Sequence, residues 1–213
     1  MTQASLSLPV ADAPDDLLSW LRLARSPRVG AATFRMLLGR YGSAREVLRA
    51  LPHHAARGGG RGYAPAPLEA VERELAAAER FGAVALRLGQ PDYPSALAEV
   101  TDAPPLLWAK GRVALATGSA VAIVGARNAS ALGLRMAEAL ASGLAGAGQV
   151  VTSGMARGVD RAAHLGAIDR GTVAVLAGGI DHIYPQQNAD IHGRMAEEGL
   201  LLSEAPMGLQ PLA

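Results

Sequence analysis

The sequence predicts an α/β fold: a Rossmann-like, doubly wound parallel sheet preceded by a small all-helical domain of the SAM or helix-hairpin-helix kind. Two observations support this prediction. After Gly118, short apolar runs without polar alternation are separated by helical segments, as expected when helices cover both faces of a parallel sheet. Before residue 52, apolar residues recur at three- and four-residue steps, which is typical of short amphipathic helices.

Residues 1–82 are predicted to form the helical domain. Three short helices fall between residues 15 and 51, and a fourth is predicted at 67–81. The segment 52–67 contains several glycines and prolines, and we expect it to form a loop. Residues 83–118 are predicted to connect the two domains and to pack on the sheet, because their prolines favour extended and turn conformations.

Residues 119–213 are predicted to form the Rossmann-like domain. Its apolar, β-rich runs and its helical segments alternate in a βαβ pattern. The predicted strands are 120–124, 149–152, 172–176 and 200–202, and the predicted helices are 129–145, 157–169 and 187–198.

Composition excludes several classes of protein. The chain has no cysteine, so disulfides, thiolate nucleophiles and Cys-based metal sites are excluded. Its apolar stretches stop short of the roughly 20 residues that a membrane helix needs. Asp12, Asp15 and Asp16 stand where a secretory signal would have basic residues before an apolar run. We therefore expect a cytoplasmic protein that does not bind membranes and has no metal site or cofactor.

Positive charge is concentrated near the amino terminus. Residues 1–62 hold nine arginines and four acidic residues, whereas the whole chain has a formal charge of +1. The turn Arg28-Val29-Gly30 stands before a predicted helix, where backbone N–H groups can bind phosphate oxygens. Phosphate binding and ordinary solvated helix faces remain alternative interpretations of this region.

Three strand ends of the predicted sheet carry glycine. In such a sheet ligands bind outside the carboxyl ends of the strands, where glycine lets the backbone approach an anion and the next helix start adds positive charge. Arg127 and Arg157 add charge at the same edge, so the sequence predicts an anion site. The three ends read Gly125-Ala126-Arg127, Ser153-Gly154-Met155-Ala156-Arg157 and Gly178-Gly179.

Common nucleotide motifs are absent from these ends. The first turn lacks the Gly-x-Gly-x-x-Gly pattern of dinucleotide-binding proteins, and no Walker-type Gly-Lys-Ser/Thr occurs. His164 is interpreted as a packing residue rather than a general base, and Glu204 as either a strand-end cap or a functional carboxylate. His182 and His192 do not have the spacing of a metal pair.

Four motifs stand at residues 125–130, 153–164, 178–185 and 203–204. In order and spacing they resemble the DNA-processing protein A (DprA/Smf) family. The resemblance implies a non-catalytic protein that binds and protects single-stranded DNA and loads the RecA recombinase during natural transformation, acting as a homodimer. The motifs are Gly125-Ala-Arg127-Asn-Ala-Ser130, Ser153-Gly154-Met-Ala156-Arg-Gly158-Val-Asp160 with His164, Gly178-Gly179-Ile-Asp181 with Tyr184-Pro185, and Ser203-Glu204.

The resemblance assigns single-stranded DNA or phosphate binding to ten positions, with Arg127 as the principal phosphate contact. It assigns no catalytic residue. The ten positions are Gly125, Ala126, Arg127, Ser153, Gly154, Met155, Arg157, Gly178, Gly179 and Asn188.

The chain departs from the family pattern in two places. Leu132 stands where the family usually has an aromatic residue, which removes a surface on which a base could stack. The chain ends at Ala213, just before the family's Phe-Pro-x-Arg-Asn segment. We therefore expect a fragment that lacks part of the phosphate pocket and much of the surface for dimerisation and RecA contact.

Two other functions remain open. A nucleotide-processing enzyme of the phosphoribohydrolase kind would carry Pro-Gly-Gly-x-Gly-Thr and a catalytic Glu, whereas this chain reads Ala177-Gly-Gly-Ile-Asp-His. A pure interaction module would use the same glycine turns without binding a ligand.

Overall fold

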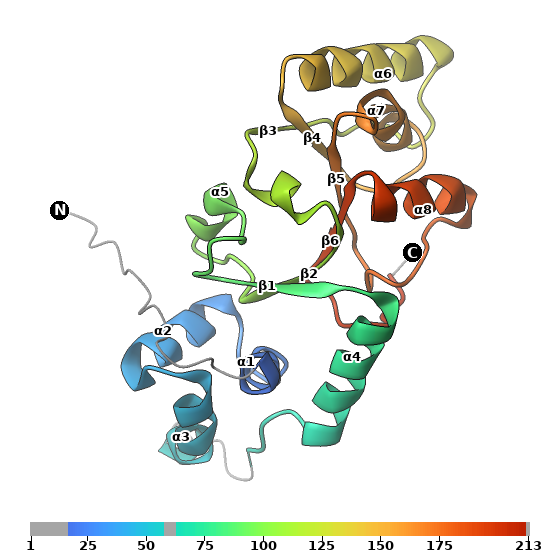
Figure 1. The fold of residues 1–213 in the computed structure, drawn as a ribbon. Coiled ribbons are helices and arrows are strands. Elements are labelled where there is room, and N and C mark those ends of the chain that lie inside the picture. The colour runs from blue at the N-terminus through green and yellow to red at the C-terminus, as the bar shows by residue number, and fades with distance from the viewer. Residues whose placement is uncertain (1–16, 58–62, 212–213) are drawn as a thin grey trace, which may run out of the picture. The chain divides into compact units, whose positions relative to one another are not determined.

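The computed structural model describes residues 17–57 and 63–211 (Figure 1). These residues fall into two compact units. The first comprises residues up to Ala76 together with residues 87–91 and 96–106. The second comprises residues 77–86, 92–95 and those from Leu107 onward, and it contains most of the sheet. The helical segments are α1 (Leu17–Ala24), α2 (Ala31–Tyr41), α3 (Ala44–Arg57), α4 (Leu68–Phe81) and the short α5 (Ser95–Ala98).

The first unit has its own apolar core, which confirms the prediction of amphipathic helices. Leu21, Phe34 and Val47 come from α1, α2 and α3, and none is more than 1% exposed. The Trp20 ring packs edge-on against Phe34, with centroids 4.9 Å apart, and its Nε1 donates to the carbonyl of Pro105 over 2.9 Å. Spaced apolar residues therefore bring three short helices together by tertiary packing, since such helices are marginal alone.

The structure shortens the predicted loop at 52–67. Helix α3 continues through Pro52 to Arg57, and Leu51 packs on the same buried face as Val47. Residues 63–67 have no helix or strand, and 58–62 lie outside the described residues. Burial of this helix face outweighs the hydrogen bond that Pro52 cannot make.

The second unit is built on a six-stranded, mostly parallel sheet with the order β1-β2-β6-β5-β4-β3. Strands β3 to β6 are parallel, and β2 pairs antiparallel with β6, with Trp108 opposite Ser203. The α/β class and its Rossmann-like sheet are therefore confirmed. The strands are β1 (Val84–Arg87), β2 (Leu106–Gly111), β3 (Ala120–Ala122), β4 (Val150–Ser153), β5 (Thr172–Val175) and β6 (Leu200–Ser203).

The segment 83–118, which we expected to pack on the sheet, contributes two strands of the sheet itself. β2 contains the apolar run Leu106 to Ala109, in which each residue is at most 5% exposed. This run continues the apolar surface beside β6 and supplies the backbone partners that β6 needs on that edge. Val113–Thr117 then form a 3₁₀ turn, η1, before β3.

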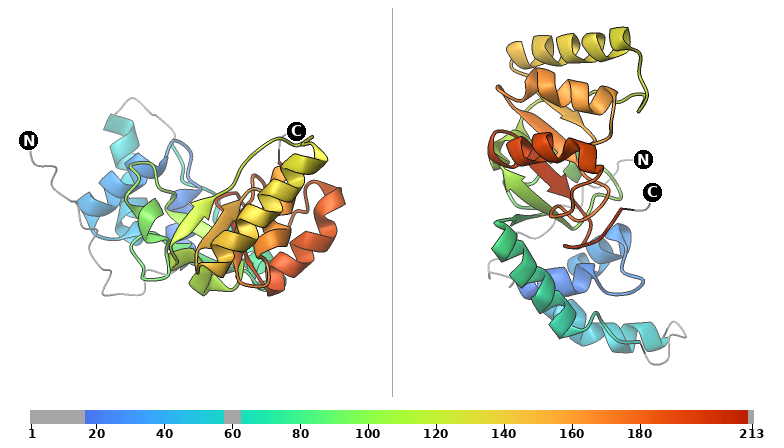
Figure 2. Two further views of the ribbon diagram at one scale, coloured as in Figure 1. Left: turned by 90° about the horizontal axis from the view of Figure 1, so that it is seen from above. Right: turned by 90° about the vertical axis from the view of Figure 1, so that its right-hand side faces the viewer.

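Three crossover helices connect the parallel strands, namely α6 (Ala131–Gly146), α7 (Val159–Ala167) and α8 (Ala189–Glu197). The order from β3 to β6 shows no reversal, so right-handed crossovers bring these helices to one face of the sheet (Figure 2, right). They form the helical layer that covers this face of the parallel strands. None of the helices within residues 17–57 and 63–211 has the length and apolar character of a membrane span.

Small residues allow α6 and α7 to pack closely. Ala141, Ala163 and Val151 are fully buried together between the two helices and β4. A Cβ on Gly166 would lie 2.3 Å from the carbonyl oxygen of Glu138, so only glycine fits where the helices meet. This close contact fixes α7, whose first turn forms part of the candidate site.

Candidate functional site

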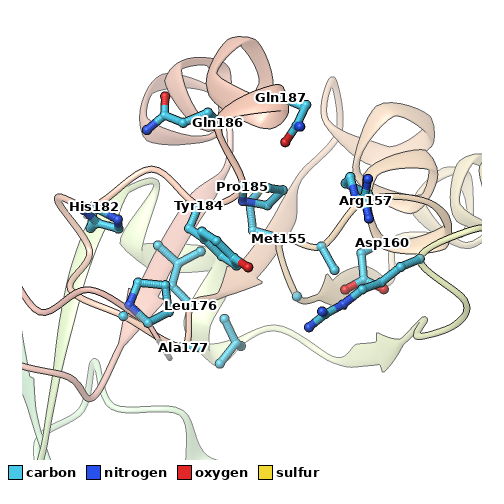
Figure 3. Close-up of a pocket in the computed structure, with 16 residues that line it drawn as sticks. Met155, Arg157, Asp160, Leu176, Ala177, His182, Tyr184, Pro185, Gln186 and Gln187 are labelled. Atoms are coloured by element: carbon cyan, nitrogen blue, oxygen red, sulfur yellow. The ribbon is translucent and has the colours of Figure 1, made fainter. Parts of the chain in front are cut away.

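A cleft of about 560 Å³ lies at the carboxyl ends of the parallel strands (Figure 3). Three strand-end segments surround it: the first turn (residues 123–130, after β3), the second turn (residues 154–158, after β4) and the third turn (residues 176–181, after β5). The first contributes Arg127 to the lining, the second contributes residues 154–157, and the third contributes residues 176–178. The cleft therefore lies at the edge of the sheet where the anion site was predicted.

The first and second turns are locked together by close backbone contact. Gly158 has φ +82°, and a Cβ there would lie 2.2 Å from the carbonyl oxygen of Ala126. The N–H of Val159 donates to that same oxygen over 3.2 Å. A Cβ on Gly125 would in turn lie 2.8 Å from the Val159 side chain. These glycines are needed because the two turns touch, and the contact brings Arg127 and Arg157 to one cleft.

Arg127 and Arg157 are exposed and line the cleft. Neither has an ion-pair or hydrogen-bond partner within the part of the chain that the structure describes. By contrast, Arg161, four residues after Arg157, makes an ion pair with Asp190 at 2.6 Å. The two cleft arginines therefore keep all their N–H donors for an external anion.

The second turn is supported from the sheet side by a buried histidine. His164 is completely buried and its Nε2 donates to the carbonyl of Gly154 over 2.6 Å, while Nδ1 lies 2.9 Å from Thr172 Oγ1. Burial lowers the pKa of His164. Its interpretation as a packing residue is confirmed. Ser153 is also buried, and its hydroxyl donates to the carbonyl of Ile123 over 2.5 Å.

Asn188 lies behind the second turn rather than in the cleft. It is 1% exposed, and its Nδ2 donates to the carbonyls of Met155 and Ala156 over 2.8 and 3.2 Å. Its Oδ1 accepts from Nη1 of Arg161 over 3.2 Å. The expected direct contact with DNA is corrected, because both ends of the amide are already occupied inside the protein.

The third turn is covered by the segment 206–211. The N–H of Gly179 donates to the carbonyl of Leu209 over 2.7 Å, and the carbonyl of Gly178 accepts from Ser203 Oγ over 2.6 Å. A Cβ on Gly179 would lie 2.8 Å from both Gly208 N and Pro206 O. The Gly179 N–H is therefore unavailable to a phosphate, and this glycine serves close packing of the chain.

The cleft thus brings together half of the ten predicted residues. The five that line it are Arg127, Gly154, Met155, Arg157 and Gly178. The other five lie beside or behind the turns, namely Gly125, Ala126, Ser153, Gly179 and Asn188.

Several lining residues lie outside the predicted set. Asp160 is 7% exposed, and its Oδ2 lies 2.7 Å from the position of a Cβ on Gly154, which explains the glycine there. Figure 3 shows Asp160 and Arg157 on one side of the cleft and Tyr184, Leu176 and Ala177 on the other. The Asp160 carboxylate has no ion-pair or hydrogen-bond partner among the described residues. In the sequence, the signal that could have identified Asp160 as a lining residue is its position one helical turn before His164.

The second wall of the cleft is apolar and aromatic. Tyr184 is 42% exposed, and Leu176 and Pro185 lie beside it in the lining. Gln186 and Gln187 follow in the 3₁₀ turn η2 (Gln186–Asn188), a position that no motif identified. No cluster of three or more His, Cys, Asp or Glu side chains suited to a metal occurs in the described ranges.

The described part of the chain is thus a Rossmann-like protein whose strand-end cleft has unpaired arginine side chains in its lining and an exposed aromatic ring on one wall. Residues 85–213 match the family model described as "DNA recombination-mediator protein A", and residues 14–77 match the "DprA-like N-terminal HHH domain". The chain belongs to the DNA recombination-mediator protein A family, as its motifs implied.

Two curated relatives illustrate the similarity. The DNA processing protein DprA of Bacillus subtilis is 37% identical over 142 residues, which cover 65% of this chain and 48% of the relative. The DNA processing protein DprA of Streptococcus pneumoniae is 40% identical over 122 residues, covering 56% of this chain and 43% of the relative. The matched part of the chain thus spans about half the length of these relatives.

Two solved structures are similar in fold and sequence. The X-ray structure of DNA processing protein A from Streptococcus pneumoniae has a TM-score of 0.60 and 34% identity, covering 67% of this chain and 49% of that one. The structure of DNA processing protein A from Helicobacter pylori, described for its single-stranded DNA binding mode, has a TM-score of 0.56 and 31% identity. It covers 61% of this chain and 59% of that one.

Proposed function

We propose that this chain binds single-stranded DNA in the strand-end cleft. Arg127 and Arg157 bind phosphate groups, and the second turn adds backbone N–H groups. The observation that carries this proposal is the pair of arginines that line the cleft and have no partner among the described residues. Arginine binds phosphate oxygens through two parallel N–H donors, and neither side chain has to give up an internal partner to do so.

The opposite wall suits a nucleobase. Tyr184 presents an exposed ring, and Leu176 and Pro185 extend the apolar surface beside it. Bases of single-stranded nucleic acids stack on aromatic side chains, whereas paired bases in a duplex have no free face. A cleft with phosphate contacts on one side and a stacking surface on the other therefore favours single strands over duplex DNA.

The wider role of the chain is proposed from its family. We infer that it protects single-stranded DNA and loads the RecA recombinase during natural transformation, as a homodimer in the cytoplasm and without catalysis of its own. The turn Arg28-Val29-Gly30 stands at the N-cap of α2, whose first N–H groups have no side-chain cap from Gly30. We propose it as an auxiliary phosphate contact.

Fluorescence anisotropy with labelled oligo-dT and a matched duplex tests the DNA-binding proposal. We expect preferential binding of the single strand, with an affinity that falls as salt rises from about 50 to about 200 mM because bound phosphates release counterions. Arg127→Ala should weaken binding and reduce the salt slope by about one unit. Arg170→Ala is the matched control, since Arg170 is exposed at the opposite end of the strands, just before β5.

A nucleotide-processing enzyme is the second candidate. The cleft volume of about 560 Å³ lies in the range of small-molecule sites, so a mononucleotide would fit. A nucleoside monophosphate should compete only weakly with oligo-dT if the cleft binds DNA. Tight mononucleotide binding without oligo-dT binding would instead favour the enzyme, and binding of neither ligand would favour a pure interaction module.

A further inference from the structure

A hydrogen-bond network behind the second turn joins α7 to the start of α8. Arg161 donates from Nη1 and Nη2 to the two carboxylate oxygens of Asp190 over 2.8 and 2.6 Å. Nη1 also donates to Oδ1 of Asn188 over 3.2 Å, and Asn188 donates onward to the carbonyls of Met155 and Ala156. Arg161, Asn188 and Asp190 are not among the cleft-lining residues, so the network acts from behind.

The network sets the direction of two peptide groups in the second turn. In a planar trans peptide the C=O and the N–H point in opposite directions. The carbonyls of Met155 and Ala156 face Asn188, so the N–H groups of Ala156 and Arg157 point away from it. Ala156 and Arg157 both line the cleft. No group among the described residues accepts a hydrogen bond from either N–H, which leaves both donors for a ligand.

Arg161 decides which way the Asn188 amide faces. A guanidinium group has only donors, so it requires the oxygen of the amide on its side and leaves the NH₂ group for the two carbonyls. Asn188 is 1% exposed, so its Oδ1 has no access to bulk water as an alternative donor. The hydrogen bond from Arg161 lowers the pKa of Asp190 to about 2, and the ion pair therefore persists throughout the neutral and mildly acidic range.

We propose that Arg161 is a positioning residue for DNA binding: through Asp190 and Asn188 it holds the N–H groups of Ala156 and Arg157 toward a DNA phosphate. This inference rests on the proposed function, because it assigns the geometry of the same cleft. Arg161 itself does not touch the DNA, and its positive charge is balanced by Asp190.

The test uses the full chain and a charge-conserving double variant, Arg161→Gln with Asp190→Asn. Its oligo-dT affinity should fall about tenfold, the effect of losing a hydrogen bond to a charged group. Its salt slope should stay that of the parent, because no ionic phosphate contact is removed. Arg157→Ala should instead reduce the salt slope by about one unit. Arg194→Gln with Glu198→Gln removes an exposed ion pair at the end of α8 without changing the net charge; it is the matched control and should bind normally.

A thermodynamic cycle and a spectroscopic readout separate positioning from general damage. Adding Asn188→Ala to the double variant should weaken binding little further, because the residues act in series. In the parent protein, inorganic phosphate or oligo-dT should shift the backbone amide NMR signals of Ala156 and Arg157. In the double variant these shifts should be lost while far-UV circular dichroism is retained.

These measurements distinguish failure of the proposed function from failure of the positioning role alone. If the parent protein fails to bind oligo-dT, the proposed function itself is refuted. If the parent binds, Arg127→Ala weakens binding, and the double variant binds like the parent, only the positioning role is refuted. Should the double variant not fold, Arg161→Lys keeps the charge but cannot reach Asp190 and Asn188 together as a planar fork. It should lose affinity at an unchanged salt slope, and parental affinity would overturn the proposal.

Discussion

The second and third turns both follow a parallel strand and both contain glycine, yet they serve different purposes. In the second turn, two carbonyls are held from behind by Asn188 and the opposite side faces the cleft. In the third turn, the Gly179 N–H is already used by Leu209. A glycine-containing strand end is therefore open to a ligand only if the rest of the chain does not cover it.

Among the substitutions that test this comparison, Gly158→Ala should have the largest effect on unfolding free energy and on oligo-dT binding. Gly158→Ala combines a strained positive φ with a Cβ placed 2.2 Å from the Ala126 carbonyl, so the first and second turns must separate. We expect a loss of about 3 kcal/mol in unfolding free energy, from backbone strain and overpacking together, and loss of oligo-dT binding. Urea unfolding and anisotropy measure the two quantities.

Gly42→Ala is the control for Gly158→Ala. Gly42 has the same φ of +82° but open space where its Cβ would stand, so only backbone strain of about 1 kcal/mol is expected. Equal destabilisation by the two substitutions would show that the contact between the turns contributes nothing.

Gly179→Ala tests whether the covered turn takes part in binding. A Cβ there would lie 2.8 Å from backbone atoms of Gly208 and Pro206 and would displace the covering segment. We expect a loss of about 2 kcal/mol in unfolding free energy. Oligo-dT affinity should change less than in Gly158→Ala. An equal or greater loss of affinity, in a variant that is still folded at the assay temperature, would mean that the third turn binds DNA directly.

Two aspartates sharpen the comparison further. Asp181 Oδ1 accepts from the N–H of Gly208 over 2.8 Å, so Asp181→Ala should lower the unfolding free energy by about 1 kcal/mol and leave oligo-dT affinity unchanged.

Asp160 faces the cleft without a partner among the described residues. Asp160→Asn removes a negative charge that repels phosphate, so affinity should rise a few-fold. Reduced affinity would instead indicate that Asp160 accepts a hydrogen bond from the DNA.

The smallest effect should come from pH. Burial lowers the pKa of His164 in the folded protein below its usual value of about 6.5. As the pH falls, the unfolded chain therefore binds a proton before the folded protein does. The contribution of His164 to the unfolding free energy is present above about pH 6.5 and is lost as the pH falls below it. Between pH 7 and pH 6 we expect His164 to lower the unfolding free energy by at most about 0.7 kcal/mol.

The variant His164→Gln isolates this contribution. Its unfolding free energy should depend less on pH than that of the parent. Burial also lowers the pKa of His192, so this histidine contributes to the pH dependence over the same range. The variant His192→Gln measures that second contribution separately. An unchanged pH dependence in His164→Gln would contradict the assignment of a neutral His164 beneath the second turn.

Local patterns were sufficient to predict much of the fold and the place of the strand-end cleft. Uninterrupted apolar runs became β4, β5 and β6 within one or two residues of their predicted bounds. Arg127 and Arg157 could be placed in one cleft because parallel strands end at the same edge of the sheet. These features depend on neighbours in the sequence or on the general geometry of a parallel sheet.

The roles of Asn188 and Gly179 could not be predicted in the same way. Whether the Asn188 amide is free depends on Arg161, 27 residues earlier in the chain, and on the carbonyls of the second turn. Whether the Gly179 N–H is free depends on Leu209. The strand β2 likewise needs β6 as a partner, although Trp108 and Ser203 are far apart in sequence. Only the folded chain determines which polar groups remain unpaired.

The covering of the third turn by residues 206–211 has a consequence for biosynthesis. Strands β3, β4 and β5 pair with near neighbours in sequence and can associate early, whereas the covering segment must first leave the ribosome. Pro211 itself lines the cleft. We therefore expect a nascent chain that has already formed its parallel strands to have an unfinished cleft, which is completed only when residues 206–211 dock.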